Sequence, residues 1–438
     1  MSRLLLANAR LVDPAAGRDG PGAILVEDGR IAAVGDRSDD WRADRTIDAG
    51  GAVLCPGLVD LSVRVREPGH EHEGMLASEL AAAVAGGVTS VVCPPDTDPV
   101  LDEPGLVEML KFRARGLDLA RLHPLGALTV GLKGQVLTEL ASLSAAGCVG
   151  FSQAEVPVRD TSVLHRALQY AATFGYTAWL RPNDAWLGQG VAAKGDLATR
   201  MGLAGIPSIA ETIALATLFE LARDTGARLH LCRLSSAAGV EAVRRAKAEG
   251  LAVTADASIH NLLLTDVDIG WYDSAMRLDP PLRQARDREA IARGLADGTI
   301  DALVSDHAPV DEDEKNVPFA ESVPGATGVE LLLGLGLMWG GAGGLSRAAT
   351  LAPVTSRPAA VLARSRLAED GAPVGLAVGA PADLVLVDVE AEGTVDPRTF
   401  RSRGRHTPFA GHALPGRVLA TVVAGRVVHE ARGSGPPP

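Results

Sequence analysis

The chain has 438 residues, of which 47% are hydrophobic, and its formal net charge is −12 at pH 7. That length is too great for one small core and predicts a large domain of barrel size with a smaller domain beside it. The acidic balance argues against a nucleic-acid or anionic-membrane partner, and no uninterrupted apolar run approaches the roughly 20 residues that cross a bilayer.

The start of the chain predicts a cytoplasmic protein. Its first apolar stretch, residues 4–6, is too short for the hydrophobic core of a signal peptide and leads directly into a strand-like segment. The cysteines are far apart and form no Cys-x-x-Cys pair; they are Cys55, Cys93, Cys148 and Cys232. We expect reduced thiols rather than a disulfide or a thiolate metal site.

Both ends of the chain are rich in short strand-like segments. At the N-terminal end these are residues 4–12, 23–26 and 31–35, with a hairpin turn at 27–30 and a loop over 36–46. At the C-terminal end they are residues 383–388 and 416–428. Neither end alone has enough strands to bury a face, so we expect residues 1–55 and 366–438 to form one small composite β-sandwich.

Residues 56–365 alternate strand-like runs with helical runs rich in Ala and Leu, which predicts a (β/α)₈ barrel. The predicted strands are 58–65, 89–93, 122–129, 147–152, 176–181, 228–234, 252–257 and 301–306, and the predicted helices include 78–85, 162–173, 209–225 and 240–249. The glycine-rich segment 340–344 is predicted as a loop and the tail 433–438 as disordered. In such a barrel the chemistry lies at the C-terminal ends of the strands.

The first predicted barrel strand carries the most informative motif. Apolar residues at 59, 61, 63 and 65 alternate with polar ones, as in a strand with one face on a core. The segment resembles the Asp-x-His-x-His-x-Arg-x-Pro-Gly strand of dihydroorotases, which belong to the amidohydrolase superfamily. Ser62 and Arg64 occupy the positions of the two histidines. The residues that fit the motif are Asp60, Arg66, Pro68 and Gly69.

The resemblance extends from residue 56 to residue 427. Its further landmarks are Gly-Gly-Val-Thr at 86–89, Pro-Asp-Thr-Asp-Pro at 95–99, Pro-Pro-Leu-Arg at 280–283 and Ser-Asp-His-Ala-Pro at 305–309. It therefore implies an amidohydrolase barrel of (β/α)₈ type, with a small β-sandwich formed by both termini.

The resemblance also implies where metal would be bound, because the family holds two zinc ions at six positions on the strand ends. These positions carry the two motif histidines, a carbamylated lysine, two further histidines and an aspartate. Here they are, in chain order, Ser62, Arg64, Ser152, Arg181, Arg233 and Asp306. Serine is a poor zinc ligand and arginine has no lone pair to give, so only the aspartate remains. A catalytic zinc site needs about three protein ligands, so we expect no metal and no cofactor.

The three arginines suggest a replacement for the metal charge. Two Zn²⁺ ions less a carbamate and an aspartate leave +2, and the arginines less Asp306 leave the same. We expect the arginines to donate salt bridges to Asp306, Asp96 or Asp184. The resemblance also implies positions that would bind substrate, and only one of them keeps the family residue. Arg66 matches the arginine that binds a substrate carboxylate, whereas the other positions depart from the family pattern. The vestigial pocket positions are Arg66, Asp96, His260 and Asn261.

The remaining histidines and serines offer alternative sites. His70 and His72 form a His-x-His pair that could be a displaced zinc site, although their place in the loop after the strand favours a solvated loop. His307 should point away from Asp306, since neighbours on a strand face opposite sides. His230 is expected to be structural, and His260 is either a vestigial pocket residue or a hydrogen-bonding partner. Ser152 and Ser235 lack a visible base that would make either a nucleophile.

Three functions remain open from the sequence. The resemblance is greatest to the inactive dihydroorotase-like chain of bacterial aspartate carbamoyltransferase complexes, which implies a non-catalytic subunit that assembles with the transferase catalytic chain as a hetero-oligomer in pyrimidine (UMP) biosynthesis. The second is an active cyclic amidohydrolase of the dihydroorotase, hydantoinase or allantoinase type, with Asp306 as base and the arginines as oxyanion donors. The third is a small-anion binding protein that uses an arginine-lined barrel mouth.

Overall fold

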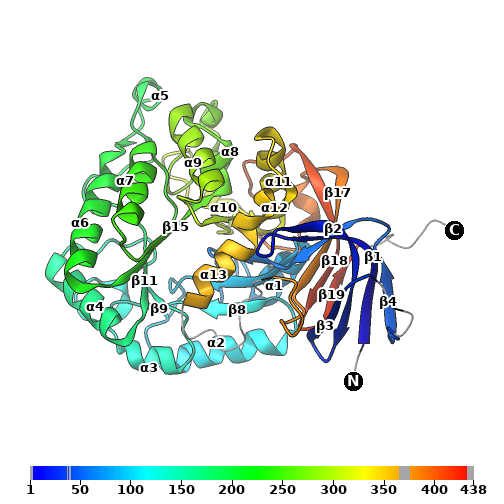
Figure 1. Cartoon of the computed structure of the whole chain (residues 1–438). Helices are drawn as coiled ribbons and strands as arrows, with labels where there is room; N and C mark the ends of the chain where they lie inside the picture. Colours follow the sequence, from blue (N-terminus) through cyan, green and yellow to red (C-terminus); the bar gives the residue numbers. More distant parts are fainter. Residues whose placement is uncertain (1–2, 37, 39–40, 365–374, 432–438) are drawn as a thin grey trace.

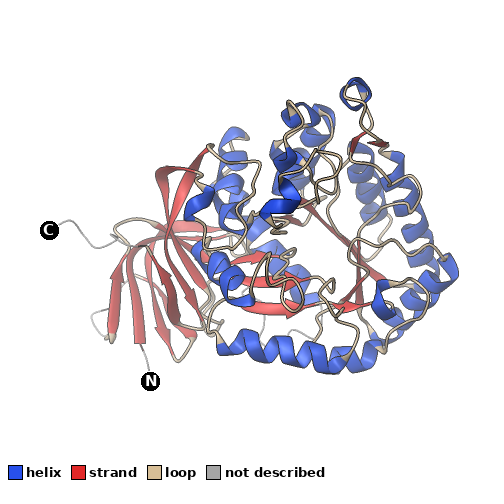
Figure 2. Ribbon diagram, turned by 180° about the vertical axis from the view of Figure 1, so that it is seen from behind, coloured by secondary structure: helices blue, strands red, loops and turns tan. Residues whose placement is uncertain are grey.

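The computed structural model describes residues 3–36, 38, 41–364 and 375–431. A barrel of parallel strands ringed by helices lies beside a sheet that contains segments from both ends of the chain (Figures 1 and 2). The predicted domain boundary at 365/366 and the predicted disordered tail at 433–438 lie outside the described residues. Within them, no helix combines the length and apolarity needed to cross a membrane.

The terminal sheet has eight strands among the described residues, in the order β19-β18-β17-β5-β1-β2-β3, with β4 beside β1. Their bounds are β1 Arg3–Asp13, β2 Arg18–Glu27, β3 Arg30–Gly35, β4 Arg45–Asp48, β5 Val53–Pro56, β17 Leu384–Thr394, β18 Ala413–Val423 and β19 Arg426–Glu430. The predicted loop 36–46 ends two residues early, because β4 begins at Arg45 and pairs in parallel with β1.

The two ends of the chain meet where β5 pairs antiparallel with β17, with Leu54 opposite Leu386. Side chains from strands far apart in the sheet order share one core, including Ile24 on β2 and Val422 on β18. The sheet therefore folds around its own core, which neither terminus could enclose alone.

The barrel strands are all parallel where they pair, and each predicted strand is present. Most have a shorter regular part than predicted, whereas the second begins one residue earlier, at 88, and the seventh is shifted by one residue to 253–258. They are β6 Leu58–Asp60, β7 Val88–Cys93, β8 Arg121–Pro124 with β9 Gly126–Ala127, β10 Phe151–Ser152, β11 Thr177–Leu180, β14 Arg228–Leu231, β15 Val253–Ser258 and β16 Ala302–Val304. The predicted (β/α)₈ architecture is confirmed.

The first barrel strand departs most from its predicted range of 58–65, because its ladder ends at Asp60. The buried Asp60 carboxylate accepts hydrogen bonds from Ser62 N and Ser305 N, both at 3.2 Å, and so takes the place of a main-chain acceptor. The barrel then closes through a parallel bridge between Val63 and His307, flanked by Arg64 N donating to His307 O at 2.9 Å.

The longer helices surround the barrel: α1 Leu76–Ala85, α2 Pro104–Gly116, α3 Leu140–Ala145, α4 Thr161–Phe174, α6 Ile209–Thr225, α7 Ala237–Ala248, α9 Ala285–Asp297, α11 Leu332–Ala342 and α13 Ser356–Arg364. Shorter elements are α5 Asp196–Arg200, α8 Ile259–Leu263, α10 Glu312–Lys315, α12 Arg347–Leu351, β12 Ala192–Ala193 and β13 Gly205–Ile206. A typical boundary is that of α4, where Asp160 caps the first turn by accepting from Ser162 N at 2.8 Å and Gly175 ends the helix at φ 71°.

The prediction of a loop over 340–344 is wrong for its first three residues, which complete α11. A Cβ on Gly340 would lie 2.2 Å from Thr350 Oγ1 on α12. The glycine therefore allows close packing of two helices, which outweighs its low helix propensity.

A buried ion pair joins the terminal sheet to the barrel. Arg121, the first residue of β8, donates from Nε and Nη2 to the two carboxylate oxygens of Asp383 at 2.9 and 3.1 Å. The buried Asp383 also accepts from Ala424 N at 2.7 Å. This carboxylate thus holds a barrel strand and the turn after β18 together.

We predict that Asp383→Asn lowers the free energy of unfolding by about 2–3 kcal/mol, because it removes a charge from a buried paired group while keeping its volume. Urea unfolding followed by circular dichroism measures the change. Asp19→Asn, which alters an exposed pair with Arg10, should stay within about 0.5 kcal/mol. Equal losses in the two variants would contradict a special role for Asp383.

Candidate functional site

The six metal-ligand positions predicted from the resemblance meet at the C-terminal ends of the barrel strands. Ser62 and Arg64 follow β6, Ser152 ends β10, Arg181 follows β11, Arg233 follows β14 and Asp306 follows β16. Parallel strands in a barrel bring these ends to one mouth. Four non-glycine residues described at the mouth have positive φ, so the backbone is strained there. They are Arg66 at 62°, Ala154 at 50°, Arg233 at 57° and Asp306 at 50°.

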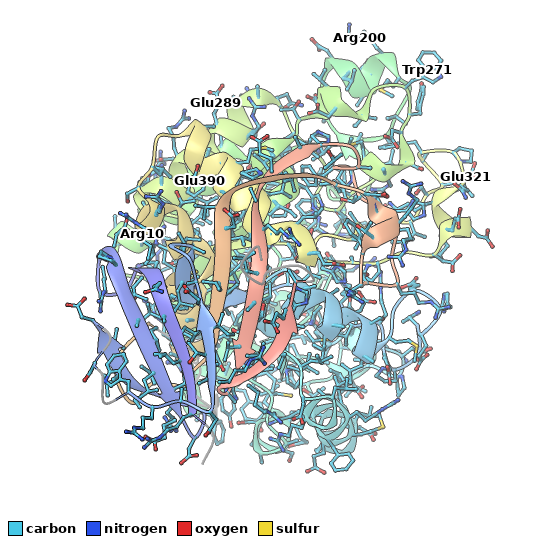
Figure 3. The ribbon with its side chains drawn as sticks, turned by 90° about the vertical axis from the view of Figure 1, so that its right-hand side faces the viewer. Arg10, Arg200, Trp271, Glu289, Glu321 and Glu390 are labelled. Atoms are coloured by element: carbon cyan, nitrogen blue, oxygen red, sulfur yellow. The ribbon has the colours of Figure 1, made fainter. Side chains whose placement is uncertain are left out.

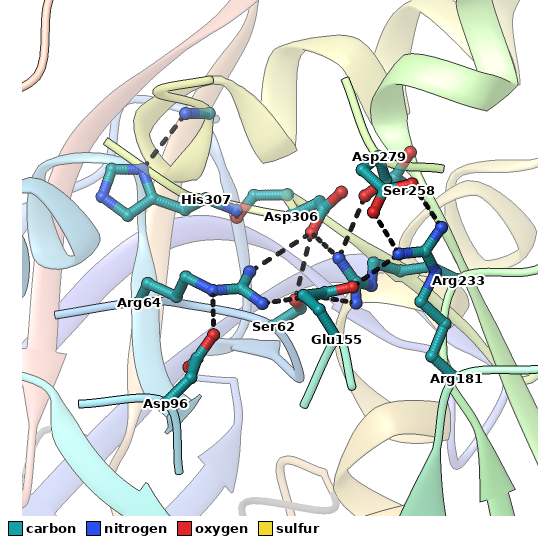
Figure 4. Close-up of polar contacts among 12 residues, drawn as sticks. Ser62, Arg64, Asp96, Glu155, Arg181, Arg233, Ser258, Asp279, Asp306 and His307 are labelled. Carbon is teal, nitrogen blue, oxygen red and sulfur yellow. Dashed lines mark hydrogen bonds and ion pairs between the residues drawn. The ribbon is translucent and has the colours of Figure 1, made fainter. Parts of the chain in front are cut away.

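The centre of the mouth is Glu155, a residue that sequence reasoning missed. Arg64 and Arg233 each donate from Nη2 to its Oε1, and Arg181 donates from Nη1 to its Oε2 at 2.6 Å (Figure 4). Glu155 lies in the loop after β10, three residues beyond Ser152, where no strand or helix period marks it. The only available signal was that an acidic residue follows a strand end expected to face three arginines.

The outer side of each arginine meets a different carboxylate (Figure 4). Arg64 Nε donates to Asp96 Oδ2 at 2.8 Å, and Arg233 Nη1 donates to Asp306 Oδ1 at 3.1 Å. Arg181 pairs with both oxygens of Asp279. Ser62 Oγ adds a longer bond of 3.4 Å to Asp306 Oδ1.

The expected pairing with Asp184 is wrong, because that carboxylate accepts from Trp186 N and Leu187 N at 3.0 and 2.8 Å and closes a turn. Asp279 and Glu155 supply the negative charge instead. Three guanidinium groups therefore meet four carboxylates, and the cluster carries a formal charge of −1 rather than the +2 inferred from the sequence.

The electrostatics of the cluster keep Glu155 ionised. Burial by itself raises the pKa of this carboxyl, but Arg233, Arg181 and Arg64 together lower its pKa well below the ordinary value. The arginine side chains keep only 6–8% of their surface exposed, while Glu155 keeps 32%. Buried guanidinium groups without anions would be costly, so the shared carboxylate is the condition for placing three of them together.

Little space remains between these side chains. The cavity at the mouth has a volume of about 20 Å³ and is lined by residues that include Ser62, Arg64, Ser152, Glu155 and Arg233. A volume of that order holds about one water molecule, and a cyclic amide ring is several times larger.

The donor set does not fit the zinc ions that the resemblance implies. The six positions present two hydroxyls, three guanidinium groups and one carboxylate, and the guanidinium groups offer no lone pair. The carboxylate of Asp306 already accepts from Arg233 and Ser62. No catalytic step through a metal at these positions is supported.

At the substrate positions implied by the resemblance, the side chains of Arg66 and Asn261 bond to neighbouring parts of the chain. Arg66 donates to Pro309 O at 2.8 Å and pairs with Glu73 at 2.7 Å. Asn261 bonds Ser258 Oγ and Pro281 O at 2.9 and 3.0 Å.

His260 is the exception among these positions. It is buried against Phe409, with ring centroids 5.7 Å apart, and its ring nitrogens make no hydrogen bond to any described residue. Burial lowers the pKa of His260 to about 4, so the ring is neutral near pH 7. A neutral ring packed on an aromatic side chain adds no charge to the mouth.

The other histidines separate into structural and surface groups. His230 bonds Thr254 Oγ1 and Asp256 Oδ2, both at 2.8 Å, and His307 points away from Asp306 to Glu79 at 2.8 Å. His70, His72 and Glu73 bring possible ligand atoms within 4.8 Å of one another, as do His230, Cys232 and Asp256. In both groups the carboxylate is already engaged, by Arg66 in the first and by His230 in the second.

The serines considered as nucleophiles also have structural partners. Ser235 Oγ donates to the buried carboxylate of Glu211 at 2.6 Å, and the same carboxylate accepts from Ser236 Oγ. Ser152 Oγ accepts from Ala154 N at 3.0 Å. The four cysteines are free thiols.

Comparisons with known proteins agree with the motif. The sequence model of the family described as dihydro-orotase-like matches residues 51–238. A dihydroorotase-like protein of Pseudomonas aeruginosa is 43% identical over 427 residues, which cover 97% of this chain and 99% of the relative. The chain belongs to the dihydroorotase-like family. A dihydroorotase of Anaeromyxobacter sp. (strain K) is 41% identical over 431 residues, 98% of each chain.

Solved structures give the same fold for this family member. L-hydantoinase from Arthrobacter aurescens superposes with a TM-score of 0.87 at 26% identity and covers 98% of this chain and 96% of its own. Dihydropyrimidinase from Brevibacillus agri superposes with a TM-score of 0.83 at 20% identity, covering 98% and 95%, and supports the fold alone. The arginine cluster is thus built on an amidohydrolase barrel.

We predict that Glu155→Gln lowers the free energy of unfolding by about 2–4 kcal/mol at pH 7, because three buried arginines lose their shared anion. The folded pKa of Glu155 is lowered, so the carboxylate stabilises the fold above its unfolded pKa of about 4.3. That contribution is lost as the pH falls through the folded pKa.

Denaturant unfolding at pH 7, 5 and 3.5 measures this difference, which should be largest at pH 5–7 and smaller at pH 3.5. Glu220→Gln removes an exposed carboxylate that pairs with Arg223 and is the matched control, expected within about 0.5 kcal/mol. If the difference in free energy of unfolding between wild type and Glu155→Gln is the same at all three pH values, Glu155 is not the anion of the cluster.

Proposed function

We propose that this dihydroorotase-like chain is a non-catalytic subunit that assembles with the catalytic chain of aspartate carbamoyltransferase and supports it in pyrimidine biosynthesis. The observation that carries the proposal is the ion-pair cluster of Arg64, Arg181 and Arg233 around Glu155, which occupies the place where the family binds metal. The scaffold is kept while the catalytic ligands are replaced by groups that stabilise the barrel mouth.

The geometry weighs against a cyclic amidohydrolase with a rebuilt site. Hydrolysis at neutral pH needs an activated water, and a zinc ion supplies that by a large drop in the pKa of its bound water. Asp306 as the sole base is held by Arg233 and Ser62. The cavity of about 20 Å³ leaves no place for a ring substrate beside it.

The geometry also weighs against an anion-binding function at the mouth. Each of the three arginines already pairs with at least two carboxylates, and the cluster carries excess negative charge. An added anion would have to displace Glu155 or one of the outer aspartates, with no gain in net charge.

The choice of partner follows from the resemblance, and the surface is compatible with assembly. Trp186 and Trp271 keep 69% and 92% of their surface exposed, and exposed aromatic side chains are typical of protein interfaces. Trp271 and Arg200 of α5 lie at the top of the molecule in the view of Figure 3, where the next residue, Tyr272, donates to Met201 O at 2.7 Å. The curated relatives include chains named dihydroorotase-like protein as well as chains named dihydroorotase.

Co-expression with the aspartate carbamoyltransferase of the same organism tests the proposal. We predict one complex in size-exclusion chromatography with light scattering, transferase activity that falls when this chain is omitted, and no ring opening of dihydroorotate with or without added zinc. A chain that elutes alone, or that opens dihydroorotate, would contradict the proposal. If the purified chain contains zinc, the zinc content of His70→Ala/His72→Ala shows where it is bound. This variant removes the two histidines of the surface cluster and leaves the mouth intact, so loss of zinc assigns the metal to the surface cluster.

A further inference from the structure

A cavity of about 140 Å³ lies to one side of the arginine cluster, between the cluster and two helices of the outer ring. Its lining comes from the loop after β10, the start of α4, the loop after β11 and the middle of α6. The helices α4 and α6 are neighbours around the barrel (Figure 1). Asp306, the base considered above, does not line this cavity, which is therefore distinct from the barrel mouth.

The buried part of this cavity is apolar. Leu164 on α4, Leu180 on β11 and Leu218 on α6 line it, and each keeps only 5–6% of its surface exposed. An apolar protein cavity of roughly 150 Å³ is large enough to hold one benzene molecule. The cavity can therefore enclose a branched aliphatic side chain or a single ring.

The exposed rim of the cavity carries two opposite charges that do not pair with each other. Arg159 places its guanidinium carbon 4.8 Å from the ring centroid of Trp186 and forms no ion pair with a described carboxylate. Asp184 accepts from Trp186 N and Leu187 N through Oδ1, and its Oδ2 has no partner within the described part of the chain. A cation and an anion without partners on one rim match a ligand that carries both charges.

The neighbouring polar groups favour the same side of the cavity. Asn183 lines it beside Asp184, and its side-chain amide makes no hydrogen bond to a described residue. On the cluster side, Glu155 and Arg181 are already engaged with each other and with further partners (Figure 4). Groups that can bind a polar ligand therefore lie beside Trp186, at the edge of an apolar floor.

We propose that this cavity binds a free α-amino acid with an aliphatic or single-ring side chain, such as leucine or phenylalanine. The side chain of the ligand fills the leucine-lined floor. The ligand carboxylate pairs with Arg159, and its ammonium group donates to Asp184 and to the amide oxygen of Asn183. A guanidinium group matches a carboxylate in shape and charge, and an ammonium group has three hydrogens to donate.

The charge of the lining agrees with a zwitterion. The charged lining residues are Glu155, Arg159, Arg181 and Asp184, whose formal charges add to zero. An amine or a carboxylic acid alone would leave one rim charge without a partner. The inference does not rest on the proposed partner of this chain, because it concerns a cavity within the isolated chain.

Titration calorimetry of the full chain with L-leucine, isocaproate and isopentylamine tests the proposal. Isocaproate is leucine without its amino group, and isopentylamine is leucine without its carboxylate. We expect one leucine per chain and affinities at least about tenfold lower for both analogues, since each has lost one charged hydrogen-bonded contact.

Two rim variants assign the charges. Arg159→Gln and Asp184→Asn should each weaken leucine binding about tenfold. Arg159→Gln should leave the affinity for isopentylamine unchanged, and Asp184→Asn should leave that for isocaproate unchanged, because each analogue lacks the group that the changed residue binds. An asparagine at this position still accepts from the main-chain N–H groups that close the turn.

A third variant fills the floor and has a matched control. Ala214→Leu places a larger side chain on the cavity wall of α6 and should abolish leucine binding. Ala216→Leu makes the same change at an exposed position of α6 that does not line the cavity, and should stay within about twofold of wild type. Circular dichroism verifies that both variants fold.

Three results would overturn the proposal. The first is the absence of both heat and saturation-transfer NMR signal with leucine and with phenylalanine. The second is equal leucine affinity in wild type and Ala214→Leu, which would place the ligand elsewhere. The third is an analogue that binds as tightly as leucine, which would mean that the cavity does not recognise a zwitterion.

Discussion

The barrel mouth depends on one carboxylate that three buried arginines share. Without Glu155, the guanidinium groups of Arg64, Arg181 and Arg233 would be brought together with too little negative charge between them. Because these arginines follow three different strands, their shared anion also ties those strand ends together. The cost of burying charge is offset only when every partner is present, so the cluster acts as a unit.

The same principle explains how a metal-binding scaffold can persist without its metal ligands. In the function proposed above, the guanidinium groups take the structural place of the metal ions that the resemblance implies, with Asp96, Asp279 and Asp306 on the outside. The arginine side chains leave about 20 Å³ between the strand ends, and a larger cavity of about 140 Å³ lies to one side of the cluster, where Glu155 and Arg181 contribute to its lining. A role in assembly is compatible with such a closed mouth, because an interface needs a stable barrel and an accessible surface rather than an open pocket.

The sequence predicted the barrel well because buried parallel strands and helices leave periodic patterns, and it predicted where the six strand-end residues would converge. It could not identify Glu155 or Asp279 as anions, since both lie in irregular segments with no period to place them. Asp184 was assigned to the cluster only because it follows a strand end, whereas its carboxylate closes a local turn. The same limit applies to Gly340, because its packing against Thr350 depends on how the next helix, α12, folds back against α11, and no residue pattern marks that.

The central claim is that an arginine cluster around Glu155 replaces the metal centre. Anomalous diffraction at the zinc absorption edge, from crystals of the chain grown with zinc, tests it most directly. We predict well-defined density for Glu155 within hydrogen-bond distance of Arg64, Arg181 and Arg233, and no anomalous peak within the barrel mouth. A strong peak between the ends of the first and sixth barrel strands, with the arginines turned away, would contradict the account.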